Sequence, residues 1–279
     1  MNAPNTSEKL LDLRYGEQDK PRNMRWNSTI EALLEHRSVR NYLPEPLPEG
    51  AIEAMVAAAQ SASNSSNLHQ WSVVVVTDVA LKARIAECSR TSGSGNPYIE
   101  KAPALLLWVA DLSRNNRIAT ADGQSAVVHE YLDALIMSTI DTALAAQNAT
   151  IAAESLGLGV CYLGAMRNNA QAVAELIGLP RFSVVVFGLL VGVPDPSVPT
   201  RIRPRPSQAV VLHHNRYDVE RSLRELASYE PAFAAFRAEL GMNQKTWKDA
   251  ARLSAVDMAY MDGRENLRGT VEQAGFKLR

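Results

Sequence analysis

The sequence has only two cysteines and almost no net charge. Cys88 and Cys161 lie far apart and form no paired metal-ligand spacing, which argues against a disulfide framework and for free thiols in a reducing compartment. Twenty-nine Lys and Arg residues face 30 Asp and Glu residues, a formal net charge of -1. This balance offers no general field for nucleic acid or an anionic membrane, so any anion site must be local.

Long apolar runs are missing as well. The two longest, 102–110 and 184–193, have about ten residues, roughly half of what a membrane-spanning helix needs. The N-terminal segment mixes acids and bases and lacks the apolar core of a signal peptide. We therefore expect a cytoplasmic location, with neither a membrane nor a nucleic acid as partner.

Most catalytic motifs are absent too. The sequence has no HExxH, Walker or GxSxG motif, and its five histidines show no metal spacing, so no metal site is expected. Gly157 and Gly159 could begin a dinucleotide fingerprint, but Tyr162 occupies its third glycine position and the segment leads into a strand. A Rossmann nucleotide site is therefore disfavoured.

The composition of the sequence is that of a folded domain. Its 279 residues are 46% hydrophobic and 21% charged, enough to bury a large core without disulfides. A polar arm without steady periodicity occupies residues 1–27 and has no assigned role. Residues 28–217 form the core, and residues 218–279 form a charged, amphipathic helical extension.

Local patterns predict the elements of the core. A capping box at Ser28 predicts one helix, and a second begins near Pro48. Apolar and β-branched runs predict four strands, at 73–77, 104–111, 159–163 and 182–193.

One long helix is predicted over residues 129–156, which contain neither proline nor glycine. Alanines surround part of its apolar stripe, so we expect this helix to be buried on several sides at the centre of the fold. The stripe consists of Leu132, Ile136, Ile140, Leu144 and Ile151.

Two basic clusters are candidates for binding a phosphate. His36, Arg37, Ser38 and Arg40 fall within five residues and offer charge-assisted donors, although basic residues can also simply complement a helix C-terminus. Arg203 and Arg205 alternate with prolines, so their side chains could point the same way, or the segment could be a solvated loop.

A polar loop at 61–67 precedes the first predicted strand. Asn64, Ser65 and Asn67 could hydrogen-bond the edge of a planar heteroaromatic ring, although turn formation explains these residue types equally well. Gly164 follows an apolar strand, where a glycine permits close approach of a flat ligand or ends the strand.

Taken together, these segments resemble the FMN-dependent nitroreductase family. The resemblance rests on 36–40, on Ala-Ser-Asn-Ser-Ser-Asn-Leu-His-Gln-Trp at 62–71, on 157–169 and on Arg203-Pro-Arg205. The helix at 141–157 and the C-terminal extension resemble the NADPH-preferring branch of oxygen-insensitive nitroreductases and flavin reductases. The resemblance implies an α+β sandwich, with a mixed sheet flanked by helices, and an intertwined homodimer with two FMN molecules at its interface.

The resemblance also assigns residues to FMN. Those expected to bind the phosphate and ribityl chain are His36, Arg37, Ser38, Arg203 and Arg205, while Arg40 faces the N1/O2 side of the ring and tunes it. The loop residues Asn64, Ser65 and Asn67 reach the flavin bound mainly by the other protomer. The ring near N5 is lined by Tyr162, Leu163, Gly164 and Ala165, with Asn96 as a further contact.

The activity implied is that of an NAD(P)H oxidoreductase that prefers NADPH and reduces nitroaromatics, quinones or free flavin by a ping-pong two-electron mechanism. No protein nucleophile is needed, because the chemistry belongs to FMN. A non-catalytic FMN-binding sensor and a reductive dehalogenase are the alternatives. Candidates for the 2′-phosphate of NADPH, or else surface charges, are Arg167, Arg237, Lys245 and Lys248.

Overall fold

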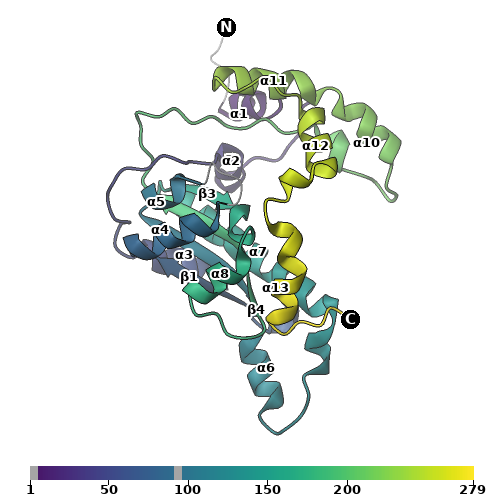
Figure 1. Ribbon diagram of the computed structural model, residues 1–279. Helices are drawn as coiled ribbons and strands as arrows, with labels where there is room; N and C mark the ends of the chain where they lie inside the picture. Colours follow the sequence, from purple (N-terminus) through teal and green to yellow (C-terminus); the bar gives the residue numbers. More distant parts are fainter. Residues whose placement is uncertain (1–5, 91–95) are drawn as a thin grey trace. The chain divides into compact units, whose positions relative to one another are not determined.

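The computed structural model describes residues 6–90 and 96–279 and divides the chain into two compact units. We call Ser38–Val198 with Met261–Arg279 the sheet unit, and Met1–Arg37 with Pro199–Tyr260 the helical unit. Figure 1 labels most of the helices and strands of both. Each unit joins segments from distant parts of the sequence, and the proposed boundaries at residues 27 and 217 stay a prediction.

The sheet unit is built on four strands in the order β1-β2-β4-β3. They are β1 Trp71–Val76, β2 Ala104–Asp111, β3 Gly159–Leu163 and β4 Ser183–Gly192, close to the four runs predicted. All their pairings are antiparallel. The α+β class is confirmed, but among the described residues the parallel part of the expected mixed sheet is only an isolated bridge between Ser38 and Val160.

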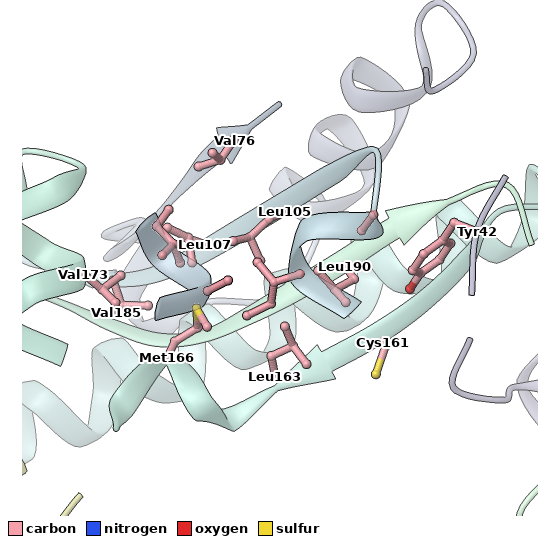
Figure 2. Packing of buried hydrophobic residues seen from close by; sticks show 14 of the residues in the cluster. Tyr42, Val76, Leu105, Leu107, Cys161, Leu163, Met166, Val173, Val185 and Leu190 are labelled. Carbon is pink, nitrogen blue, oxygen red and sulfur yellow. The ribbon is translucent and has the colours of Figure 1, made fainter. Parts of the chain in front are cut away.

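Both faces of this sheet are covered, so β2 is buried along its whole length. On one face of the sheet, Leu106 and Trp108 pack with α3 (Ala51–Gln60) and α7 (Leu132–Ser155). Leu105 and Leu107 pack on the opposite face of the sheet, in the cluster that Figure 2 shows. This alternation is the two-residue period of a strand between two layers. The remaining elements of the unit are η1 Ser65–Asn67, α4 Val79–Cys88, α5 Tyr98–Lys101, α6 Ser113–Thr120, η2 Val127–Glu130, η3 Gly164–Arg167, α8 Ala170–Leu176, η5 Arg264–Asn266 and α13 Leu267–Gln273.

The long helix α7 turns a different face inward from the one predicted. Ala145, Ala146 and Ala149 are buried against the sheet and α3, because small side chains let these elements approach closely. For the single chain, the expected burial of the stripe is wrong over most of its length: Ile140 keeps 54% of its surface exposed, and Leu132, Ile136 and Leu144 are exposed as well. Ile151 is half-buried.

The helical unit contains a helix that the sequence pattern did not predict, α1 (Thr6–Tyr15), within the polar arm. It is followed by α2 (Ser28–Glu35), whose N-cap is Asn27 rather than Ser28: the Asn27 side chain accepts a hydrogen bond from the backbone N–H of Ile30. The other elements are α9 Gln208–Val211, α10 Val219–Leu226, α11 Tyr229–Glu239, α12 Trp247–Val256 and η4 Met258–Tyr260. No helix in the described part of the chain is long and apolar enough to cross a membrane.

A close backbone contact anchors the segment that carries Ser38 and Arg40. The Val39 N–H donates to the Val160 carbonyl at 2.8 Å, and a Cβ on Gly159 would lie 2.7 Å from the Val39 Cβ. Gly159→Ala should therefore push this segment away from β3 and lower the free energy of unfolding by about 1–3 kcal/mol. Thermal unfolding measures the loss.

The matched control is Gly269→Ala, because Gly269 lies inside α13 and a Cβ there meets nothing within 4 Å. Alanine favours a helix over glycine, so this variant should be neutral or slightly more stable. Equal stability of both variants would show that the Gly159 contact tolerates a methyl group.

Candidate functional site

The helical unit brings its two arginine segments together. Arg37 follows His36, the C-cap of α2. The Arg37 Nε donates to Thr200 Oγ1 at 3.0 Å. Thr200 opens the loop that carries Arg203 and Arg205. This hydrogen bond links Arg37 to the start of the loop, and the joint binding of a phosphate by the two clusters stays a prediction.

Arg203 and Arg205 lie on the exposed side of this loop, with buried Pro204 between them. The Tyr229 hydroxyl of α11 donates to the Pro204 carbonyl at 2.9 Å, and the Arg203 guanidinium lies over the Phe236 ring at 5.4 Å. Within the described residues, neither Arg37 nor Arg205 forms an ion pair with a carboxylate. Their guanidiniums can therefore serve an external anion.

In the sheet unit, Ser38 is exposed, Val39 is buried and Arg40 is half-buried. Val39 packs in the core, which leaves its two neighbours on the other side of this extended segment. The structure describes no ion pair of Arg40 with a carboxylate either. A half-buried, unneutralised guanidinium is suited to a ligand that carries or gains negative charge.

The polar loop has a strained and well-held backbone. Ser66, Asn67 and His69 have φ values of 50°, 56° and 49°, in the left-handed region that non-glycine residues rarely adopt. The Asn64 side chain accepts from the His69 N–H at 3.3 Å, and the Arg114 guanidinium donates to the His69 carbonyl at 2.7 Å. Such strain, maintained by surrounding contacts, is common at binding sites.

An open groove of about 420 Å³ runs between this loop and α7. Asn64 and Ser65 line one side, and Ile140 and Leu144 of the exposed stripe line the other. Asp141 is 2% exposed and accepts from the Ser65 N–H at 2.9 Å, while its second oxygen has no partner in the described chain. Sequence reasoning missed Asp141 as the residue that holds the loop, because only the fold brings it there.

At the end of β3, Tyr162 and Gly164 keep some exposure, whereas Leu163 is buried in the core. Leu163 can thus contact a ligand only through its backbone. Thr150 Oγ1 donates to the Tyr162 hydroxyl at 2.9 Å, and burial raises the pKa of Tyr162 to about 12, so the phenol stays protonated at neutral pH. Gly164 and half-buried Ala165 begin η3. The atoms nearest to a Cβ on Gly164 would be those of the Arg167 guanidinium, the first of them at 3.3 Å.

Two amide side chains have buried oxygens without a partner in the described residues. Asn96, the residue that follows the undescribed segment 91–95, is one of them. Gln70, 1% exposed, is the other, and the sequence analysis did not assign it although it lies within the recognised 62–71 segment. A buried amide oxygen without a partner is rare in native proteins, because leaving it unpaired costs free energy.

Two of the four candidates for the 2′-phosphate of NADPH make hydrogen bonds within the chain. Arg167 donates to the Val186 carbonyl at 2.5 Å. Arg237 donates from Nε to the Asn243 carbonyl at 2.9 Å and lies over Phe233. Lys248 is exposed and Lys245 half-buried.

These groups fit FMN in their chemistry. The helical unit offers guanidiniums for a phosphate, and the sheet unit offers a protonated phenol, polar loop residues, unpartnered amides and an unneutralised guanidinium for a polar ring. These groups match the polar parts of FMN, and their individual contacts with it stay predictions.

The chain belongs to the nitroreductase family. The model of the nitroreductase family matches residues 33–193, and the model of the family's C-terminal domain matches residues 203–279. The family resemblance seen in the sequence is confirmed.

Similar proteins are known from several bacteria. The chain is 33% identical over 255 residues to "FMN reductase (NADPH)" of Bacillus subtilis, covering 90% of this chain and 98% of that protein. It is 35% identical over 231 residues to "Oxygen-insensitive NADPH nitroreductase" of Salmonella typhimurium, covering 82% and 91%.

Solved structures agree with the fold. A hypothetical oxidoreductase of Bacillus subtilis, YcnD, superposes with a TM-score of 0.82 at 30% identity, over 91% of this chain and all of that one (100%). The NADPH:FMN oxidoreductase of Vibrio harveyi complexed with NAD+ superposes with a TM-score of 0.77 at 30% identity, over 91% and 100%.

Proposed function

We propose that this protein is an FMN-dependent NAD(P)H oxidoreductase that prefers NADPH and reduces nitroaromatics, quinones or free flavin. The observation that carries the proposal is the set of exposed guanidiniums on Arg37, Arg203 and Arg205, held by one loop and the adjoining helix end. Relatives over most of the chain's length are named as NADPH-dependent flavin and nitro reductases, which supports the same chemistry.

Each group of residues has a distinct task in this proposal. His36, Arg37, Ser38, Arg203 and Arg205 bind the FMN phosphate and ribityl chain. The backbone and side chains at 162–165, with Asn96, contact the ring. When bound, FMN would supply the hydride and electron transfer between the nicotinamide and the acceptor, so no side chain has to act as a nucleophile.

We further propose a homodimer in which the exposed stripe of α7 lies in the interface. The groove beside the stripe also contains Asn64 and Ser65, so a partner covering α7 would reach these loop residues. Asn64, Ser65 and Asn67 then contact the FMN bound mainly by the other protomer. The free thiols of Cys88 and Cys161 agree with a cytoplasmic location.

Anaerobic reduction of the purified, FMN-loaded protein tests the proposal. NADPH should bleach the yellow protein faster than NADH does, and a nitroaromatic or a quinone should restore the colour. A yellow protein that is inert to both nicotinamides would be a binding sensor. Reoxidation by a halogenated aromatic with release of halide, and not by the other acceptors, would indicate reductive dehalogenation.

Arg40 provides a test of electronic tuning. A positive charge beside N1/O2 favours the reduced, anionic flavin, so Arg40→Gln should lower the two-electron midpoint potential by about 20–45 mV, the equivalent of about 1–2 kcal/mol. Dye equilibration measures the potential. The control Arg268→Gln removes an exposed guanidinium of α13 and should leave the potential unchanged. An unaltered potential in Arg40→Gln would make Arg40 a structural residue.

A further inference from the structure

We propose that helix α1, with the turn after it, is part of the phosphate-binding site of this protein, and that Arg14 and Gln18 are positioning residues for Arg203 and Arg205. The inference rests on the proposed function, because it takes the anion to be the FMN phosphate. It concerns residues of the helical unit alone.

Arg14 joins the two segments that carry the arginines. Its side chain is 5% exposed, and its guanidinium donates to the Arg203 carbonyl at 2.8 Å and to the Leu34 and His36 carbonyls at 2.5 and 3.0 Å. The last two carbonyls lie at the C-terminal end of α2, where a cation is favoured. One buried guanidinium thus ties the loop at Arg203 to the segment that precedes Arg37.

Gln18 holds the next part of the same loop. Its side-chain amide donates to the Arg205 carbonyl at 3.0 Å and to the Tyr15 carbonyl at 2.7 Å. Its amide oxygen accepts from the Ser207 N–H at 3.0 Å. Gln18 is buried, so these bonds are shielded from competing water.

The loop depends on α1 because it has few hydrogen-bond donors of its own. Pro204 and Pro206 lack N–H groups, which leaves Arg205 and Ser207 as the backbone donors between 204 and 207. Both are used by the α1 segment: the Arg205 N–H donates to the Arg14 carbonyl at 2.7 Å, and the Ser207 N–H donates to Gln18. The backbone that sets the direction of both arginine side chains is therefore fixed by residues 14–18.

This arrangement is a property of the chain's N-terminal segment. The match to the nitroreductase family model begins at residue 33, whereas α1 ends at Tyr15. Fixing flexible arginines before the ligand arrives lowers the entropy that binding costs, so a segment outside the matched region can raise FMN affinity without touching FMN.

The test compares FMN with riboflavin, which has the same ring but no phosphate. Dissociation constants are measured by flavin fluorescence quenching on the full chain. We expect Arg14→Gln and Gln18→Met to weaken FMN binding about tenfold, as loss of an orienting contact typically does, and to leave riboflavin binding within twofold. Arg14→Lys retains one charged donor, so its FMN dissociation constant should lie between those of wild type and Arg14→Gln. This variant replaces Arg14→Gln in the comparison if Arg14→Gln does not fold. Arg22→Gln, which removes an exposed guanidinium close by in sequence, is the matched control.

Two further measurements distinguish the role of α1 from the binding of the FMN phosphate itself. In an Arg205→Ala background, Gln18→Met should lose most of its effect on FMN, since the Gln18 side chain holds the Arg205 carbonyl and acts through the arginine that is gone. In the FMN-free protein, amide hydrogen exchange of peptides spanning residues 203–210 should be faster in Arg14→Gln than in wild type. A wild type that binds FMN no better than riboflavin contradicts the proposed phosphate site. A wild type that prefers FMN, with Arg14→Gln, Arg14→Lys and Gln18→Met all unchanged in affinity and exchange, overturns the role of α1.

Discussion

Replacing Ile140 with glutamate should convert the protein from a dimer into a monomer. Ile140 lies in the middle of the exposed stripe of α7, and a glutamate there would be buried without a partner in the proposed interface. Burying an uncompensated carboxylate costs several kcal/mol, so the dimer dissociation constant should rise by about two orders of magnitude or more. Sedimentation velocity at several concentrations measures it.

FMN affinity should fall together with dimerisation, because the proposed site takes Asn64 and Ser65 from the other protomer. Val79→Glu is the control, since Val79 is an exposed apolar residue outside the stripe and stands in the first turn of α4, where a negative charge is favourable. A variant Ile140→Glu that remains dimeric would show that the stripe is not the interface. A monomer with full FMN affinity would place the polar loop away from the partner's flavin.

Arg205→Ala should weaken FMN binding by about one to two orders of magnitude, because a charge-assisted hydrogen bond contributes about 1.5–3 kcal/mol. Riboflavin lacks the phosphate, so it should bind wild type more weakly than FMN does and be almost indifferent to the substitution. Titration of both ligands into both proteins gives the four dissociation constants.

Arg201→Ala is the control within the same loop. Arg201 is exposed and its Nε lies 3.7 Å from Glu239, a surface ion pair of little energetic value. Its removal should leave both dissociation constants nearly unchanged. Equal losses of FMN and riboflavin affinity in Arg205→Ala would mean that Arg205 does not bind the phosphate.

Local sequence was sufficient to predict the strands of the sheet. Residues 104–110 are apolar at every position on both faces. With Asp111 they form β2, which is buried throughout, because a strand between two covered faces needs apolar side chains on both sides. The family was also recognisable, since its motifs are short and each depends on neighbouring residues. The roles of Arg40, Asn96 and the other site residues remain predictions until a flavin is bound and measured.

Two features were decided only by tertiary structure. The leucine and isoleucine stripe of α7 looked like a core face, but close packing against the sheet selected the alanine face instead, which left Ile140 exposed. Hydrophobic periodicity cannot distinguish a face that meets the chain's own core from one that meets a partner, because both exclude water.

The second feature is the structure around the arginine loop. The sequence determined that Arg203 and Arg205 alternate with prolines, and therefore that the loop is extended and poor in donors. It could not show that Arg14 and Gln18, nearly 190 residues earlier, supply the missing partners. Hydrogen bonds between segments so distant in sequence leave no periodic pattern, so only the folded chain decides which groups meet.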